Sequence, residues 1–148
     1  MKWTQSISMA GLVIAMACTA ATAAASDVGA LVEKRQQAFK QNKKDAGLIK
    51  RSLASGDTQA VREAALRIAA WAKQIPAAFP PDSNPSPSDA RDDIWLDFDG
   101  FKQKAEANRQ AAQALADAVE QNASADTLKV RFGALGQSCK ACHDAFKN

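Results

Sequence analysis

The sequence predicts an all-α protein that folds as a left-handed, antiparallel four-helix bundle in up-down-up-down order. In four segments, apolar or small side chains recur at alternating steps of four and three residues, which is the spacing of one helix face. Polar or proline-rich stretches separate these segments, and none shows the alternation of a β-strand. A mean step of 3.5 residues favours nearly parallel helices with a left-handed supercoil.

We expect the first helix over residues 27–53 and the second over residues 58–74. The first stripe consists of Val28, Val32, Arg35, Phe39, Asn42, Ala46, Ile49 and Leu53. Gly56 interrupts the helical pattern, and Asp57 has a side chain of the type that caps the next helix. Pro76 ends the second helix, because proline cannot continue the hydrogen-bonding pattern. The short link makes these helices antiparallel neighbours.

Residues 76–92 form the one long connection, since the four prolines that follow Pro76 in this stretch exclude a regular helix. We expect the third helix over residues 93–122 and the fourth after a cap at Ser124 or Asp126. The fourth stripe consists of Leu128, Phe132, Leu135, Cys139, Cys142 and Phe146. The last helix therefore carries two cysteines on its core face.

Residues 1–25 have the composition of a cleaved signal peptide. Lys2 supplies a basic start, residues 7–16 are mostly apolar, and small residues precede the expected cleavage site. An acylated Cys18 is a weaker alternative. No segment approaches the roughly 20 apolar residues that a membrane helix requires. Residues 26–148 then form one domain, which we expect in the periplasm.

The run Cys139-Lys140-Ala141-Cys142-His143 matches the C-x-x-C-H signature of covalent c-type haem attachment. On a helix, the three-residue spacing places both sulfur atoms on one face, where they can bond to a haem. The imidazole of His143 follows directly and is expected to be the proximal ligand of the iron. The motif predicts one covalently bound haem c beside the C-terminal helix.

Two other uses of the cysteine pair are possible in principle. A zinc site needs about four ligands, but residues 26–148 contain no further cysteine and no histidine besides His143. A non-haem thiol redox module would place the pair in a βαβ context, whereas a helical pattern precedes Cys139. Haem attachment is therefore the favoured interpretation.

The sixth position of the iron has no conventional protein ligand. A c-type iron that only passes electrons usually takes His/Met or bis-His ligation, and residues 26–148 contain no methionine and no second histidine. The sequence thus predicts that the sixth position is empty or water-filled, and a five-coordinate iron can bind an exogenous diatomic ligand. The alternative is a low-spin electron shuttle in which a lysine, with Lys43 as candidate, is the sixth ligand.

Two residues on the first stripe are candidates for the haem pocket. Arg35 is a cation at a core position, and a buried cation requires a counter-charge such as a haem propionate. Phe39, one turn later, is placed to cover the distal face of the haem. The alternatives are that Arg35 extends to the surface at the edge of the core and that Phe39 is an ordinary core residue.

The charge balance gives no reason to expect nucleic acid as a partner. Residues 26–148 carry 18 basic and 16 acidic side chains. No carboxylate pair, activated nucleophile or phosphate-binding loop is recognisable, so we do not expect an enzyme. Basic residues on or beside the last helix, Lys129, Arg131, Lys140 and Lys147, could steer an acidic redox partner or simply form a solvated face.

Several motifs together resemble those of cytochrome c′, the class II c-type cytochromes. The most specific is the run from Ser138 to Phe146, which contains the haem motif. The others are Ile94-Trp95, Phe101-Lys102-Gln103-Lys104, Ala77-Ala78-Phe79 and Arg35-Gln36. The resemblance covers residues 26–148 and implies a periplasmic monohaem electron-transfer protein with a four-helix fold.

The resemblance also implies roles for individual residues. It assigns thioether bonds to Cys139 and Cys142, axial ligation to His143 and a propionate contact to Arg35. Phe39 stands where the family keeps a leucine, or a methionine in its low-spin members, so it favours the five-coordinate branch that binds carbon monoxide and nitric oxide. Lys147 stands where many members have an arginine. The family often forms homodimers through its first two helices.

Overall fold

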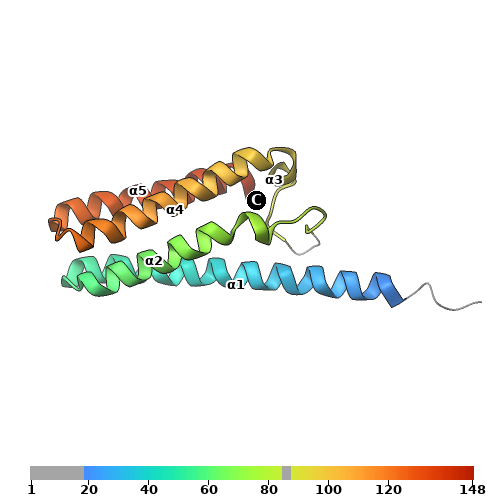
Figure 1. Ribbon diagram of the computed structural model, residues 1–148, viewed down its shortest axis with the longest axis horizontal. Helices are drawn as coiled ribbons and strands as arrows, with labels where there is room; N and C mark the ends of the chain where they lie inside the picture. Colours follow the sequence, from blue (N-terminus) through green and yellow to red (C-terminus); the bar gives the residue numbers. More distant parts are fainter. Residues whose placement is uncertain (1–18, 85–87) are drawn as a thin grey trace, which may run out of the picture.

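The computed structural model describes residues 19–84 and 88–148, and they fold into five α-helices and one short 3-10 helix. Figure 1 shows their order along the chain. The elements are α1 (Thr19–Ser55), α2 (Thr58–Gln74), η1 (Pro76–Ala78), α3 (Asp93–Leu96), α4 (Phe98–Glu120) and α5 (Ala125–Phe146). Within the described part of the chain no helix is long and apolar enough to cross a membrane.

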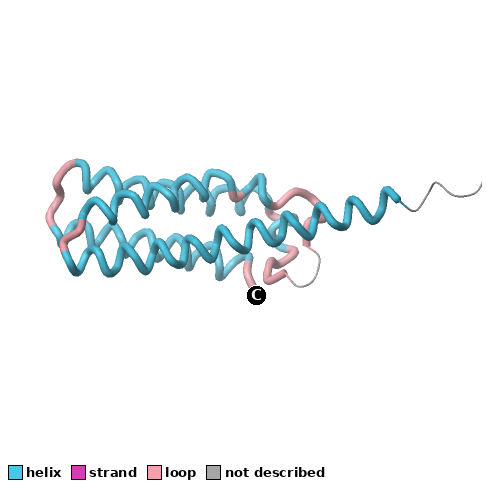
Figure 2. The backbone as a smooth tube through the Cα atoms, turned by 90° about the horizontal axis from the view of Figure 1, so that it is seen from below, coloured by secondary structure: helices cyan, strands magenta, loops and turns pink. Residues whose placement is uncertain are grey.

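The four long helices form an antiparallel bundle in up-down-up-down order (Figures 1 and 2). α1 packs against α2, α2 against α4, and α4 against α5, whereas α1 and α5 meet at only a few residues. The described residues contain no β-strand, only one isolated β-bridge. The predicted all-α four-helix bundle is therefore confirmed.

The predicted turns are present, with their capping residues. Gly56 has a φ of 79°, a conformation that glycine adopts without steric cost. Asp57 then caps α2 by accepting a hydrogen bond from the backbone nitrogen of Ala60 at 3.1 Å. Ser124 caps α5 in the same way, accepting from the backbone nitrogen of Thr127 at 3.2 Å, which decides between the two predicted caps.

Two helix boundaries differ from the prediction. α1 begins at Thr19 and not at residue 27, so the end of the predicted signal peptide continues the helix beyond the bundle (Figure 1). Residues 1–18, which include Cys18 and most of that predicted peptide, lie outside the described residues.

The predicted third helix is interrupted at Asp97, which separates α3 from α4. The Asp97 carboxylate accepts a hydrogen bond from the backbone nitrogen of Gly100 at 3.0 Å and so caps α4. A β-carbon at position 100 would lie 2.1 Å from Oδ2 of Asp97, so glycine leaves the room that this cap needs. The apolar stripe continues through the break, which is why periodicity alone did not reveal it.

The core consists of two clusters at opposite ends of the bundle. The first lies near the two short turns and is built from aliphatic and alanine side chains of all four long helices, among them Ile49, Val61, Leu115 and Leu135. The second lies near the ends of α2 and α5 and is called the aromatic cluster below, because it holds several phenylalanine and tryptophan rings. Its largest buried members are Phe79, Ile94, Phe101 and Phe146. The second cluster borders the candidate site.

Candidate functional site

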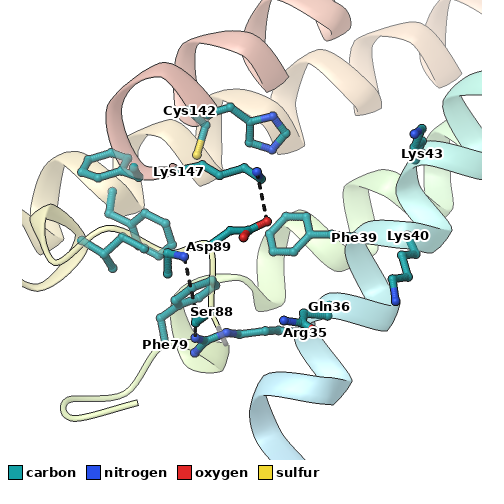
Figure 3. Close-up of a pocket in the computed structure, with 15 residues that line it drawn as sticks. Arg35, Gln36, Phe39, Lys40, Lys43, Phe79, Ser88, Asp89, Cys142 and Lys147 are labelled. Carbon is teal, nitrogen blue, oxygen red and sulfur yellow. Dashed lines mark hydrogen bonds and ion pairs between the residues drawn. The ribbon is translucent and has the colours of Figure 1, made fainter. Parts of the chain in front are cut away.

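A cavity of about 530 Å³ opens between α1 and the end of α5 (Figure 3). It exists because these two helices diverge at the end of the bundle that carries the aromatic core cluster. The connection before α3 and the start of α4 close its remaining sides. The lining residues are Arg35, Gln36, Phe39, Lys40, Lys43, Phe79, Ser88, Asp89, Ala90, Ile94, Phe101, Cys142, His143, Phe146 and Lys147.

The cysteine pair lies where α5 borders this cavity, and both thiols are free and partly buried. Cys142 lines the cavity. Cys139, one turn earlier, packs against the first core cluster and accepts a hydrogen bond from Nδ2 of Asn108 at 3.2 Å. Burial raises the pKa of both thiols, so both are protonated at neutral pH.

His143 is exposed at the mouth of the cavity, next to Cys142 on α5. Its pKa is lowered, first by partial burial of the imidazole and then by the ammonium group of Lys147. A lowered pKa favours the neutral imidazole, which is the form that binds metals. Within the described residues, no group of three or more metal-binding side chains is gathered, so nothing adds support to a zinc site.

Phe39 faces His143 across the cavity. The centroids of the two rings are 6.5 Å apart, and the ring planes are inclined by 67°. Trp71 packs edge-to-face against the other side of Phe39, with ring centroids 5.6 Å apart. Edge-to-face aromatic rings in direct contact have centroids about 4.5–7 Å apart, so Phe39 and His143 border the same part of the cavity from opposite sides.

Arg35 is buried at the base of the cavity, with 3% of its surface exposed. Its guanidinium donates hydrogen bonds to Oγ of Ser83 at 3.2 Å and to Oγ of Ser88 at 3.1 Å, and lies over the ring of Phe79 at 4.3 Å. Burial lowers its pKa.

Arg35 has no carboxylate partner within the described part of the chain, because its hydrogen-bond acceptors there are the neutral oxygens of Ser83, Ser88 and Ala78. A buried cation is stabilised by a counter-charge. A ligand with carboxylate groups, bound in the adjacent cavity, would supply it. The cysteine and histidine donors, the cavity and this buried cation all fit a haem.

The connection before α3 is held against the end of α5. The ammonium of Lys147 forms an ion pair with Asp89 at 3.2 Å across the cavity (Figure 3). The backbone nitrogen of Arg91 donates to the carbonyl of Phe146 at 3.0 Å, and that of Asn148 to the carbonyl of Asp89 at 2.9 Å. These contacts fix one wall of the cavity.

The structure thus brings four of the five predicted site residues to one cavity, namely Arg35, Phe39, Cys142 and His143, and places Cys139 beside it. Their roles toward a haem stay predictions. Sequence reasoning did not identify the serines that hold Arg35 or the partner of Lys147, because a proline-rich connection has no periodicity from which contacts can be inferred.

The model of the cytochrome c′ family matches residues 30–147 of this chain. A cytochrome c′ from Rhodospirillum rubrum is 34% identical over 139 residues, which cover 90% of this chain and 92% of that protein. These matches span the full bundle and both sides of the cavity.

Two solved structures are also similar. A nitric oxide complex of a mutant cytochrome c′ from Alcaligenes xylosoxidans has a TM-score of 0.72 and 29% identity, and the match covers 82% of this chain and 96% of that one. A cytochrome c′ with ligand-controlled dimer dissociation has a TM-score of 0.74 and 25% identity, covering 81% and 95%. The chain therefore belongs to the cytochrome c′ family of haem-binding electron-transfer proteins, and its cofactor is one covalently bound haem c.

Proposed function

We propose that this protein is a periplasmic cytochrome c′ whose iron is held by the protein from one side only and binds nitric oxide or carbon monoxide on the other. The observation that carries the proposal is the pair of residues that face each other across the cavity. His143 is the one histidine of the sequence, and the group that faces it is Phe39, which has no donor atom for a metal.

Each predicted site residue has a task in this proposal. Cys139 and Cys142 form the thioether bonds, His143 ligates the iron, and Arg35 binds a propionate. When bound, the haem supplies one-electron chemistry and an open coordination position. The protein positions it with the last two turns of α5 and screens it from water with the ring of Phe39, supported by Trp71.

The nitric oxide complex of a related cytochrome c′ supports gas binding, and the match to a cytochrome c′ with a dissociating dimer is consistent with a homodimer. Residues 1–25 are proposed as the signal peptide that directs export. The partners of the electron exchange are proposed to be redox proteins, without a role for nucleic acid. No catalytic role is proposed, since gas binding and electron exchange need no group besides the haem and its pocket.

The visible absorption spectrum of the reduced protein tests the proposal. We expect the broad bands of a five-coordinate, high-spin iron, and a sharp low-spin spectrum only after addition of carbon monoxide. A sharp α band without any added ligand would contradict the proposal. A colourless protein from a host that attaches haem would instead favour a thiol redox module.

The second candidate is a low-spin electron shuttle with a lysine as sixth ligand. Lys43 lines the cavity, which is the observation that favours it. If Lys43 ligates the iron, Lys43→Ala will convert a low-spin spectrum to a high-spin one. Under our proposal the spectra of this variant and of the unchanged protein are the same.

A further inference from the structure

One exposed face of α1 carries a stripe of basic residues. Lys40, Lys43, Lys44, Lys50 and Arg51 are all exposed. The last four follow Lys40 by three, four, ten and eleven residues, which places all five on one side of the helix. At a rise of roughly 1.5 Å per residue, the stripe extends for about 16 Å. The acidic residue within this segment, Asp45, is buried and points away from the stripe.

The charges of this lysine stripe are not compensated within the protein. The described residues form eight ion pairs, and none of them includes a basic residue of α1. Asp45 is paired with Arg67 of α2. The stripe therefore presents a continuous positive potential to solvent.

The last helix differs in this respect, although the sequence suggested it as the surface that steers a partner. Lys129 is paired with Asp126 at 3.1 Å, Lys140 with Asp144 at 2.5 Å, and Lys147 with Asp89 at 3.2 Å. Of the four basic residues named for this surface, Arg131 alone is in no ion pair of the described residues. Paired charges attract a distant partner far less than unpaired charges do. The structure therefore favours α1 over α5 as the surface that attracts a redox partner.

The stripe is continuous with the haem site. Lys40 and Lys43, at its start, line the cavity, and Figure 3 shows both on the helix that forms one side of it. A macromolecule attracted to the stripe would therefore lie beside the group that exchanges electrons. Positive charge at this position could guide a redox partner to the haem, whereas a solvated face elsewhere on the protein could not.

Two other occupants fit the stripe poorly. In a two-fold symmetric dimer the same patch meets itself, so two copies of this chain would bring like charges together. A lipid surface binds helices that add large apolar side chains to a basic face. The exposed large apolar residues of the described chain are Leu96 and Val130, which lie on α3 and α5.

We propose that the lysine stripe of α1 is the docking surface for an acidic redox protein that exchanges electrons with the haem. The inference rests on the proposed function, because it assumes an electron-transferring haem in the cavity. The chemistry of the partner follows from charge complementarity: carboxylate groups clustered around its own redox centre would face the stripe.

The test uses the haem-loaded full chain and two variants with equal change of net charge. The stripe variant carries Lys40→Gln, Lys44→Gln and Lys50→Gln, and the control carries Lys102→Gln, Lys129→Gln and Arg131→Gln. Glutamine is chosen because it has nearly the helix propensity of lysine. Lys43 is left unchanged because it is the alternative iron ligand.

The first measurement is oxidation of the reduced protein by ferricyanide in a stopped-flow instrument. One electron leaves the haem and ferricyanide becomes ferrocyanide, without proton transfer. At about 20 mM salt we expect the stripe variant to react about fivefold more slowly than the control, and the difference to vanish at about 0.5 M salt. Equal rates for the two variants would overturn the inference.

The second measurement is binding, followed by calorimetry with an acidic [2Fe–2S] ferredoxin as probe. We expect the stripe variant to bind about tenfold more weakly than the control at low salt. Equal affinities would overturn the inference. Loss of binding to phosphatidylglycerol vesicles in the stripe variant, with unchanged ferredoxin binding, would replace the protein partner by a membrane and also overturn it.

A cationic oxidant, tris(phenanthroline)cobalt(III), separates this inference from the proposed function. If neither oxidant reacts with any of the three proteins, electron exchange itself is wrong. If both oxidants react and the two variants behave alike, the haem protein functions as proposed and only the docking surface is wrong.

Discussion

Arg35 is a buried cation whose surroundings lack a counter-charge that a cofactor could supply. It sits on the core face of α1, almost without exposure, and its contacts are neutral oxygens and an aromatic ring. A guanidinium in such a position is costly to bury unless a counter-charge is near. The propionates of the haem are the natural source, and the residue can then influence the electronic properties of the iron.

The first prediction concerns the reduction potential. Arg35→Gln removes a positive charge beside the haem. The loss of this charge stabilises the oxidised iron relative to the reduced iron, because the oxidised iron carries one more positive charge. We expect the potential to fall by roughly 30–60 mV, a three- to tenfold change in the one-electron equilibrium. Spectroelectrochemical titration measures it. Lys34→Gln, at the exposed neighbouring position, is the control, and equal shifts in both variants would remove the special role of Arg35.

The second prediction concerns gas entry past Phe39. The ring faces His143 and is held by Trp71, so it occupies the space through which a distal ligand would approach the iron. Phe39→Ala should raise the association rate for carbon monoxide by about tenfold, equivalent to a barrier lowered by about 1.4 kcal/mol. Flash photolysis measures this rate.

Phe98→Leu provides the comparison for this prediction. Phe98 belongs to the same aromatic cluster and packs against Phe101, but it does not line the cavity. Its replacement should leave the association rate unchanged. An unaltered rate in Phe39→Ala would show that the ring does not screen the iron.

At the scale of the helices, α1 and α2 are joined by a polar contact within their packing interface. Asp45 of α1 is 2% exposed and accepts hydrogen bonds from Nε and Nη2 of Arg67 at 3.0 and 2.7 Å. Gln41 donates to its other oxygen at 3.3 Å. Because Arg67 remains half exposed, the guanidinium keeps part of its hydration and the pair avoids the full desolvation cost of a buried ion pair.

The third prediction follows from this contact. Asp45→Ala leaves the Arg67 guanidinium without its acceptor and should lower the free energy of unfolding by about 1–3 kcal/mol. Urea unfolding of the haem-loaded protein measures it. Glu106→Gln, which removes the exposed partner of Arg109, should leave stability unchanged because exposed pairs contribute little. Similar losses in both variants would contradict the assigned importance of the α1–α2 contact.

The elements show where prediction from the sequence succeeds and where it fails. The apolar stripes predicted the bundle because each apolar helix face must be buried. Asp57 caps α2 as expected, because its carboxylate accepts a hydrogen bond from a backbone N–H group of the first turn. Asp97 has the same chemistry but lies inside a continuous stripe, so it was not recognised as a break. Asp45 lies off the stripe, and only the approach of α2 reveals that it is buried.

The candidate site likewise has features that the sequence predicts and features that it does not. The C-x-x-C-H motif, and the lack of methionine and of a second histidine in residues 26–148, are properties of composition and local spacing, so they are visible in the sequence. Ser83 and Ser88, which hold Arg35, are more than 40 residues away along the chain. The pairing of Lys147 with Asp89 likewise depends on which segments come together. The same holds for the stripe on α1, which takes part in no ion pair of the described residues.

In the whole molecule, the two ends of the bundle are built differently. At one end, aliphatic and alanine side chains from four helices fill the interior. At the other, α1 and α5 diverge around the cavity, and the aromatic cluster forms only part of the wall. Under the proposed function the haem completes the core at this end, and its removal should destabilise this end of the bundle more than the other.

The last prediction compares this protein with and without its haem, using the unloaded chain from a host that lacks the attachment machinery. A covalently attached haem remains on the unfolded chain, but its apolar surface is buried only in the folded state, which stabilises that state. Its loss should affect the nearest segments most. We expect hydrogen exchange to become faster in the last turns of α5 and in residues 88–94, while the segment around Val61 and Leu115, in the filled end, keeps its protection. Both proteins have the same sequence, so no substitution complicates the comparison. Faster exchange to the same extent at both ends would mean that the haem stabilises the bundle as a single unit and not as part of one core cluster.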